Sequence, residues 1–345
     1  MRAVTIHGPK DIRVEQVPDA AIRHPTDAVV RVTHSCVCGS DLWAYRGRVP
    51  RQPGQRIGHE FVGVVEDVGA DVRTLRRGDR VVAPFVWSEG TCAYCVAGLP
   101  TSCPSKGFWG DPGADGAQGE AVTAPYADAT LVALPADVDE DRMPAVLALS
   151  DVMCTGHHGA RGAGVGPGSD VAVVGDGAVG LCAVLAARRL GAARIAVFGH
   201  HRSRAAVARR FGADIVVLAD AGSVAAHALE LTEGKGFTSV VEAVGTADAM
   251  AAATAVAAPG GRIGFVGVPH GSQDGIDLRA MFDRNLTLAG GITPARTYIP
   301  HLLADVLSGA LDPAPIFDLT VGLTDVPDGY AAMDERRALK TLIRI

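Results

Sequence analysis

The sequence predicts an α/β protein with two domains, one rich in β-strands and one built on a doubly wound parallel sheet. Its 345 residues exceed what a single compact core usually holds. Up to about residue 150, short apolar runs are separated by turns rich in Gly, Pro and Asp. From about 153 to 290, apolar strands alternate with helical segments, which is typical of a parallel sheet covered on both faces. The last 50 or so residues are mixed again, so the expected domains are 1–152 with 291–345, and 153–290.

The individual elements follow from hydrophobic patterning and turn residues. In the first domain we expect short strands at 28–32, 61–65, 80–84 and 131–134. In the second domain the expected strands are 171–174, 194–198, 215–218, 239–244 and 262–266. The helices expected between them are 179–190, 202–211, 223–231 and 247–257.

Composition excludes several classes of protein. Thirty-two Lys and Arg residues against 38 Asp and Glu give a net charge of −6, and no basic block is present, which disfavours a nucleic-acid or membrane partner. The N-terminus has no apolar signal core, and the longest apolar stretch, 171–187, is interrupted by Asp176 and three glycines. We therefore expect a cytoplasmic protein.

The number and spacing of the cysteines bear on disulfides and metal binding. The chain has seven cysteines, which makes a disulfide framework a poor interpretation. Three of them lie within twelve residues, which suggests a metal site.

A glycine-rich turn follows the first strand of the second domain. Residues 171–180 read as a strand that runs into G-x-G-x-x-G and then into a helix, a context that makes dinucleotide binding the favoured interpretation. The expected cofactor contacts are Gly175, Gly177, Ala178, Val179 and Gly180 in the turn, and Val244, Val266 and Val268 at or just after the ends of later strands.

The end of the second strand bears on which cofactor is bound. An NAD site normally has Asp or Glu there to bind the ribose 2′-hydroxyl, and this chain has none. Gly199 would leave room for a 2′-phosphate, and His200, His201, Arg202 and Arg204 could supply donors and positive charge. We therefore expect NADP in preference to NAD. The alternative is that Arg202 and Arg204 are solvated charges at the start of a helix.

Two segments carry residue types that suit Zn²⁺. They are Cys38-Gly39-Ser40-Asp41 and Gly58-His59-Glu60, and a catalytic zinc needs about three such ligands and one open position. Taken alone, a Cys in an apolar strand is more often a core residue, and a lone His is more often a structural group.

These motifs resemble those of the zinc-dependent medium-chain alcohol dehydrogenases. Segment 58–72 matches their zinc signature, G-H-E-x-x-G-x5-G-x-x-V, and 38–41 matches their first ligand loop. Segment 149–159 resembles the segment of the third ligand, which is Asp in the bacterial secondary-alcohol branch. The resemblance implies a catalytic zinc on Cys38, His59 and Asp151 with Glu60 beside it, Cys154 being the alternative third ligand. It also implies a GroES-like catalytic domain, a Rossmann domain and a homo-oligomer, either a dimer or a tetramer.

The resemblance further implies the chemistry. Zinc polarises the oxygen of an alcohol, a hydride passes to NAD(P), and Ser40 matches the hydroxyl that takes the alcohol proton. Trp43 stands where many members have a His that passes this proton to solvent. An apolar pocket is expected to favour apolar or aromatic substrates, although two or three of its residues could equally be core; they are Trp43, Phe85, Trp87, Phe108 and Trp109.

A second zinc site is implied by the clustered cysteines. The family has four Cys spaced C-x2-C-x2-C-x7-C, and this chain keeps the spacing with Glu89, Cys92, Cys95 and Cys103. A carboxylate can replace a thiolate on zinc, so we expect a structural site and two zinc ions per chain. The alternatives are a three-Cys site completed by another group, or an empty lobe.

Other functions are weighed against this expectation. A zinc-dependent polyol or sugar dehydrogenase uses the same metal chemistry on a more hydroxylated small molecule. A zinc-free quinone or enoyl reductase of the same superfamily would lack the Cys38 and His59 ligands, which this chain keeps. A non-catalytic, lens-type structural relative would show damage to the ligand set.

Overall fold

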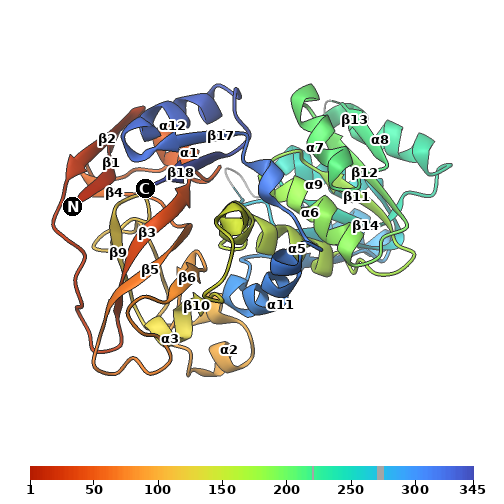
Figure 1. The fold of residues 1–345 in the computed structure, drawn as a ribbon. Helices are drawn as coiled ribbons and strands as arrows, with labels where there is room; N and C mark the ends of the chain where they lie inside the picture. The colour runs from red at the N-terminus through yellow and green to blue at the C-terminus, as the bar shows by residue number, and fades with distance from the viewer. Residues whose placement is uncertain (220, 270–275) are drawn as a thin grey trace. The chain divides into compact units, whose positions relative to one another are not determined.

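The chain folds into two units, each built around its own sheets (Figure 1). The computed structural model describes residues 1–219, 221–269 and 276–345, without the side chains of 221 and 222. One unit comprises Met1–Asp151 and Pro294–Ile345, and the other comprises Val152–Thr293.

The first unit is dominated by antiparallel strands. In the described part of the chain its largest sheet runs β10-β6-β5-β3-β18-β17, with β9 also paired to β3, and smaller sheets run β2-β1-β4 and β7-β8. The strands are β1 (Arg2–Gly8), β2 (Asp11–Gln16), β3 (Ala28–Cys36), β4 (Gln55–Arg56), β5 (Phe61–Val68), β6 (Arg80–Ala83), β7 (Val86–Trp87), β8 (Gly107–Phe108), β9 (Ala121–Ala124), β10 (Val132–Ala133), β17 (Leu319–Gly322) and β18 (Thr341–Arg344). The helices are α1 (Asp41–Tyr45), α2 (Ala93–Val96), α3 (Ala127–Thr130), α4 (Met143–Ala148), α11 (Ala295–Ser308) and α12 (Val326–Asp334).

The central strands of this unit form because branched apolar side chains fill both faces. On β3, Val30 and Val32 are buried in one core with Phe61 and Trp109. The C-terminal strand β18 pairs antiparallel with the end of β3, so the last residues of the chain lie beside the segment that leads to Cys38. This pairing brings distant parts of the sequence to the metal-binding region.

The second unit is a six-stranded parallel sheet, counted over the residues that the structure describes. Its order is β13-β12-β11-β14-β15-β16, so the sheet grows outward in both directions from the pair β11 and β14. The strands are β11 (Asp170–Val174), β12 (Arg194–Gly199), β13 (Ile215–Leu218), β14 (Phe237–Glu242), β15 (Ala257–Phe265) and β16 (Thr287–Gly290). The helices are α5 (Val152–Gly162), α6 (Ala178–Arg189), α7 (Ala205–Arg210), α8 (Ala221–Leu231), α9 (Ala247–Val256) and α10 (Leu278–Asp283). This strand order is that of a Rossmann domain.

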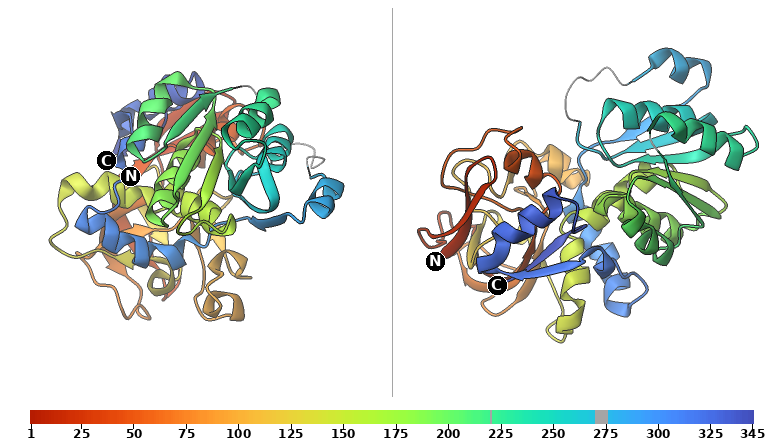
Figure 2. Two further views of the ribbon diagram at one scale, coloured as in Figure 1. Left: turned by 90° about the vertical axis from the view of Figure 1, so that its right-hand side faces the viewer. Right: turned by 90° about the horizontal axis from the view of Figure 1, so that it is seen from above.

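Helices cover both faces of this sheet (Figure 2). On one face Val240 is buried with Val256 of α9 in a shared core. Its neighbour Val241 points to the other face, where it lies against Gly159 of α5. The expected fold class, a GroES-like β-rich domain with a Rossmann domain, is confirmed by this architecture together with the comparisons given below.

Local differences from the expected elements are small. The helix expected at 202–211 begins with a 3₁₀ turn at Arg202–Arg204 and becomes α-helical only at Ala205.

In the described residues, no helix combines the length and apolar character needed to cross a membrane.

Candidate metal and cofactor sites

Four residues with metal-binding side chains meet in the first unit. Cys38 follows strand β3, while His59 and Glu60 precede β5; because Ser35 of β3 pairs with Phe61 of β5, these segments leave the sheet side by side. Asp151 follows α4 and completes the group. One ligand atom from each of the four residues lies within 4.8 Å of the others. The group contains the expected ligands and does not contain the alternative, Cys154.

The spacing of these atoms fits a tetrahedral metal. The carboxylate oxygen Oδ2 of Asp151 lies 3.7 Å from Sγ of Cys38 and 3.5 Å from Nε2 of His59. Zinc bonds of about 2.0–2.3 Å separate the ligand atoms of a tetrahedral site by roughly 3.3–3.6 Å. The side chains of His59 and Asp151 are each 14% exposed, so one side of the cluster is accessible. The residues present therefore fit a catalytic zinc.

The charges of the clustered side chains also favour the binding of a cation. Burial raises the pKa of the Cys38 thiol, and the nearby acids Glu60 and Asp151 raise it further against the opposing charge of Lys340. Burial opposes a charge on His59, but Asp41 and Asp151 together raise its pKa well above the usual value. Without a metal these groups hold protons, and a bound cation takes the place of those protons.

Two neighbours position the ligands. Oδ1 of Asp41 lies 3.4 Å from Nδ1 of His59, which directs Nε2 of the imidazole towards the cluster. Nζ of Lys340, on the segment before β18, donates to Oε1 of Glu60 at 2.8 Å, and both side chains are only 1% exposed. The other oxygen of Glu60, Oε2, is buried without a partner in the described structure.

The charges of this buried pair are mutually stabilised. Burial opposes the charge on Lys340, but the acidic groups of Cys36, Glu60 and Cys38 raise its pKa well above the usual value. Burial raises the pKa of Glu60, and Lys340 counteracts that effect. The Lys340 ammonium thus fixes the Glu60 oxygen Oε1 at a position 3.9 Å from Nε2 of His59.

The aromatic residues expected in the pocket separate into two groups. The ring of Phe85 lies 6.5 Å from that of His59, and Phe108 lies 6.3 Å from Phe85. In contrast, Trp109 is 3% exposed, donates to the carbonyl of Thr123 and stacks edge-on against Trp87. The structure therefore corrects the expectation for Trp109, which is a core residue because its ring is enclosed by the β-rich sheet.

The two residues expected in the proton relay lie at helix α1. Ser40 is the exposed N-cap residue of α1, two positions after Cys38. Trp43 is half-buried on the same helix, with the guanidinium of Arg48 5.2 Å from the centre of its ring.

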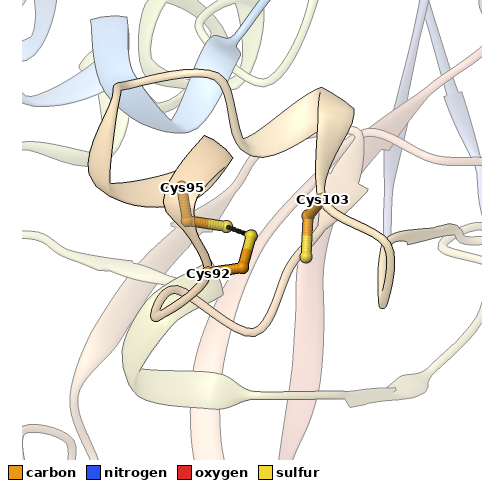
Figure 3. Close-up of side chains that lie close together, drawn as sticks. All are labelled: Cys92, Cys95 and Cys103. Atoms are coloured by element: carbon orange, nitrogen blue, oxygen red, sulfur yellow. Dashed lines mark hydrogen bonds between the residues drawn. The ribbon is translucent and has the colours of Figure 1, made fainter.

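Three cysteines gather around α2 (Figure 3). The sulfur atoms of Cys92, Cys95 and Cys103 lie within 4.8 Å of one another, and those of Cys92 and Cys95 are 3.5 Å apart. Glu89 is not brought into this group; its carboxylate instead accepts from the hydroxyl of Ser105 at 3.4 Å. The structure assembles three of the four expected structural ligands.

The glycine-rich turn has the shape needed to approach a ligand. Gly175 has a φ of +114°, and a side chain on Gly180 would overlap the carbonyl oxygen of Gly175, so both positions require glycine. A Cβ on Gly177 would meet no atom within 4 Å, which leaves open space above the turn. Ala178 and Val179 follow as the first residues of α6. These features fit the pyrophosphate of a dinucleotide.

The other expected cofactor contacts lie at the carboxyl ends of adjacent strands. Val244 follows β14, and Val266 and Val268 follow β15. Val244 and Val268 are exposed, Val266 is buried, and the Val244 side chain lies beside the position a Cβ on Gly175 would take. In open α/β sheets, ligands bind at this edge.

The space expected beside Gly199 is filled. A Cβ on Gly199 would lie 2.5 Å from Oδ2 of Asp176, the residue between the first two glycines of the turn. Asp176 also binds His201 and Arg204, two of the groups expected to meet a 2′-phosphate. His200 and Arg202 are exposed. The Asp176 carboxylate therefore occupies the space in which a 2′-phosphate was expected, and no pattern along the chain indicates that Asp176 reaches the second strand.

Comparison with known proteins gives the family. Residues 24–136 match the alcohol dehydrogenase GroES-like domain, and residues 178–308 match the zinc-binding dehydrogenase family. Over 337 residues the chain is 34% identical to a probable zinc-binding alcohol dehydrogenase of Mycobacterium tuberculosis, covering 97% of this chain and 86% of the relative. Alcohol dehydrogenase TADH from Thermus sp. ATN1 is similar with a TM-score of 0.93 and 34% identity, over 100% of this chain and 99% of that one. The chain belongs to the zinc-dependent medium-chain alcohol dehydrogenases.

This alcohol dehydrogenase is therefore a zinc-dependent oxidoreductase of alcohols and carbonyl compounds, and the expected family and reaction class are confirmed. The zinc-free reductase is not supported by these comparisons. A zinc-binding dehydrogenase from Sinorhizobium meliloti 1021, whose structure holds NADP, is similar with a TM-score of 0.86 and 27% identity, over 100% of this chain and 99% of that one.

Three residues that shape the sites of this alcohol dehydrogenase were not predicted from the sequence. Asp41 lies three positions after Cys38 in the first ligand loop, and this spacing is a signal that could have indicated its role. Lys340 stands in an apolar run near the end of the chain, where a lone charge could have suggested a buried partner. Asp176 occupies a variable position of the glycine motif, and only the folded turn shows its direction.

Proposed function

We propose that this enzyme transfers a hydride between an alcohol and a nicotinamide dinucleotide, with Cys38, His59 and Asp151 as the ligands of the catalytic zinc. The observation that carries the proposal is the approach of three chemically different ligand atoms at tetrahedral spacings. Zinc bound there supplies a Lewis acid that lowers the pKa of an alcohol oxygen.

The residues of the chain then perform the remaining tasks. Asp41 holds the imidazole of His59 in the orientation that presents Nε2. Oγ of Ser40 would accept the proton of the alcohol while its own hydroxyl proton passes to water. Because Ser40 is exposed, water can take that proton onward, and the His that Trp43 replaces is not needed for its release.

For the substrate we propose an apolar or aromatic alcohol or carbonyl compound. Phe85 lies against His59, and Phe108 extends the aromatic surface from Phe85. Such a surface favours apolar groups over the hydroxyl groups of a polyol or sugar, which it cannot hydrogen-bond.

For the second metal we propose a structural zinc held by Cys92, Cys95 and Cys103, giving two zinc ions per chain. The sulfur atoms already lie within 4.8 Å of one another, and a thiolate cluster of this kind is a typical zinc site. Glu89 would complete it by rotating its carboxylate away from Ser105.

For the dinucleotide we propose NAD in place of the NADP expected from the sequence. The glycine-rich turn supports a dinucleotide of either kind, while the carboxylate of Asp176 beside Gly199 disfavours a 2′-phosphate.

The expected homo-oligomer, a dimer or a tetramer, remains a proposal. Strand β16 lies at one edge of the parallel sheet, and Leu278 and Phe282 of α10 are exposed. An open edge strand and exposed apolar side chains are features of subunit interfaces. Light scattering coupled to gel filtration tests the assembly.

The ligand assignment is tested with paired variants. Asp151→Ala should lose one zinc per chain and all alcohol-dependent reduction of the dinucleotide, measured by metal analysis and by nicotinamide absorbance. Cys154→Ala is the matched control and should keep both. Full activity in Asp151→Ala, or loss of zinc in Cys154→Ala alone, would remove Asp151 from the ligand set.

A further inference from the structure

The acid that an NAD site usually carries at the end of its second strand is replaced here by glycine. Gly199 is the last residue of β12, and its missing side chain leaves a space at the carboxyl edge of the sheet. That space is occupied from the opposite direction by Asp176, which belongs to the glycine-rich turn after β11. A carboxylate is therefore present where the usual acid would be, although it comes from a different strand.

Hydrogen bonds hold the Asp176 carboxylate in place. Oδ2 accepts from the backbone N–H groups of His200 at 2.8 Å and His201 at 2.7 Å. Oδ1 accepts from Nδ1 of His201 at 2.8 Å. Burial opposes its ionisation, but the bonds from His201 and the charge of Arg204 outweigh burial and keep its pKa below the usual value. The group is a fixed negative charge.

Oδ1 retains capacity for a further donor. A carboxylate has about four acceptor positions, and the two on Oδ2 are used by backbone N–H groups. On Oδ1, the second contact is a long one, 3.4 Å from the Arg204 guanidinium. A hydroxyl group of a ribose could therefore donate to Oδ1 at little loss of existing bonds.

The charges around Asp176 do not favour a second anion. Arg204 is a cation already paired with Asp176, so the two charges balance. Nδ1 of His201 lies 2.8 Å from Oδ1 of Asp176, so this ring too is engaged by the carboxylate. Only His200 and Arg202 of the expected phosphate-binding groups remain exposed to solvent. A 2′-phosphate carries close to two negative charges and would lie beside a carboxylate.

We propose that Asp176 is the cofactor-selecting residue, whose carboxylate accepts a hydrogen bond from the adenosine ribose and excludes the 2′-phosphate, so that the enzyme prefers NAD. This inference rests on the proposed nicotinamide cofactor. The proposal predicts that a residue of the glycine motif, and not one at the end of β12, determines the preference for NAD over NADP.

Direct binding tests the inference without turnover. The zinc-loaded enzyme is titrated with NADH and with NADPH, and the dissociation constants are read from nicotinamide fluorescence. We expect the wild type to bind NADH at least tenfold more tightly. Asp176→Asn keeps the shape and one acceptor oxygen but removes the charge, and it should shift the ratio at least tenfold towards NADPH.

Moving the acidic residue from the glycine-rich turn to the end of β12 distinguishes the effect of its charge from an effect on local folding. Asp176→Gly should lose the preference, and Asp176→Gly combined with Gly199→Asp should regain it, because the acid returns to the same space from β12. Asp170→Asn is the matched control, since Asp170 pairs with Arg194 at the start of β11 and β12, away from the turn. It should leave the ratio unchanged, and thermal unfolding confirms that each variant is folded.

The outcomes distinguish this inference from the function that it depends on. A wild type that binds neither dinucleotide would overturn the proposed cofactor altogether. A wild type that prefers NADPH, or a folded Asp176→Asn variant whose ratio stays within twofold of the wild type, would overturn the role of Asp176 alone. Failure of the double swap to restore the preference would also count against it.

Discussion

Replacing Lys340 by Met tests how the metal-binding region is stabilised. The change leaves the carboxylate of Glu60 buried without its cation, 2.8 Å from the position that Nζ occupied. At an effective dielectric constant of about 20, the attraction at this distance is roughly 6 kcal/mol before desolvation is counted. Removing one partner of a buried pair typically costs about 3–5 kcal/mol. For a unit of about 200 residues this corresponds to a fall in melting temperature of roughly 6–20 °C.

The assay is thermal unfolding of zinc-loaded protein followed by circular dichroism, with metal content measured in parallel. Glu60→Gln combined with Lys340→Met is the control, because it removes both charges and should recover most of the loss. The loss in Lys340→Met should also shrink at acid pH, since a protonated Glu60 needs no counter-charge. A melting temperature within about 2 °C of the wild type, or a double variant as unstable as the single one, would refute the reasoning.

Three further predictions follow from the geometry. Asp41→Asn should weaken zinc binding by about 10–100-fold in a chelator competition, because the imidazole of His59 loses its orienting carboxylate; unchanged affinity would contradict this. Burial raises the pKa of Glu242 above the value of about 4.3 in an unfolded chain, so the folded state binds a proton that the unfolded state has lost. Its contribution to stability is therefore complete below about pH 4.3 and is lost as the pH rises through the folded pKa. Relative to wild type, Glu242→Gln should gain melting temperature as the pH is raised, and parallel pH profiles would show the assignment to be wrong. Phe85→Ala should raise the KM for aromatic alcohols by about tenfold more than for short aliphatic ones, as steady-state kinetics can show; an equal change for both would place Phe85 outside the pocket.

The sequence was sufficient for the parts of the fold that depend on local patterning. The strand at Ile215–Leu218 matches its expected bounds, and the strand that leads into Gly175 differs by one residue, because apolar runs between turns determine such elements. Helix α7 starts later than expected, since the 3₁₀ turn at Arg202–Arg204 depends on how Asp176 holds the preceding backbone. The hydrophobic pattern along the chain cannot predict that hydrogen bond between Asp176 and the backbone of His201.

In the sites too, residues in local motifs could be predicted, whereas partners brought together by the fold could not. Cys38, His59 and Asp151 could be named because their motifs match a family, and the structure brings them together. Lys340 could not be matched with Glu60, because 280 residues separate them and only the pairing of β18 with β3 makes them neighbours. Trp109 was misjudged because an aromatic residue looks the same in a core and in a pocket until its surroundings are known.

The position of β18 also affects how the protein is made. This strand lies between β3 and β17 inside the largest sheet, yet it is formed by residues 341–344, which leave the ribosome long after β3 does. Until then the end of β3, residues 34–36, lacks its partner strand, and the Glu60 carboxylate lacks Lys340. Nascent or prematurely terminated chains should therefore expose unpaired backbone groups at this strand end, so their survival in the cell should depend on chaperones that shield it.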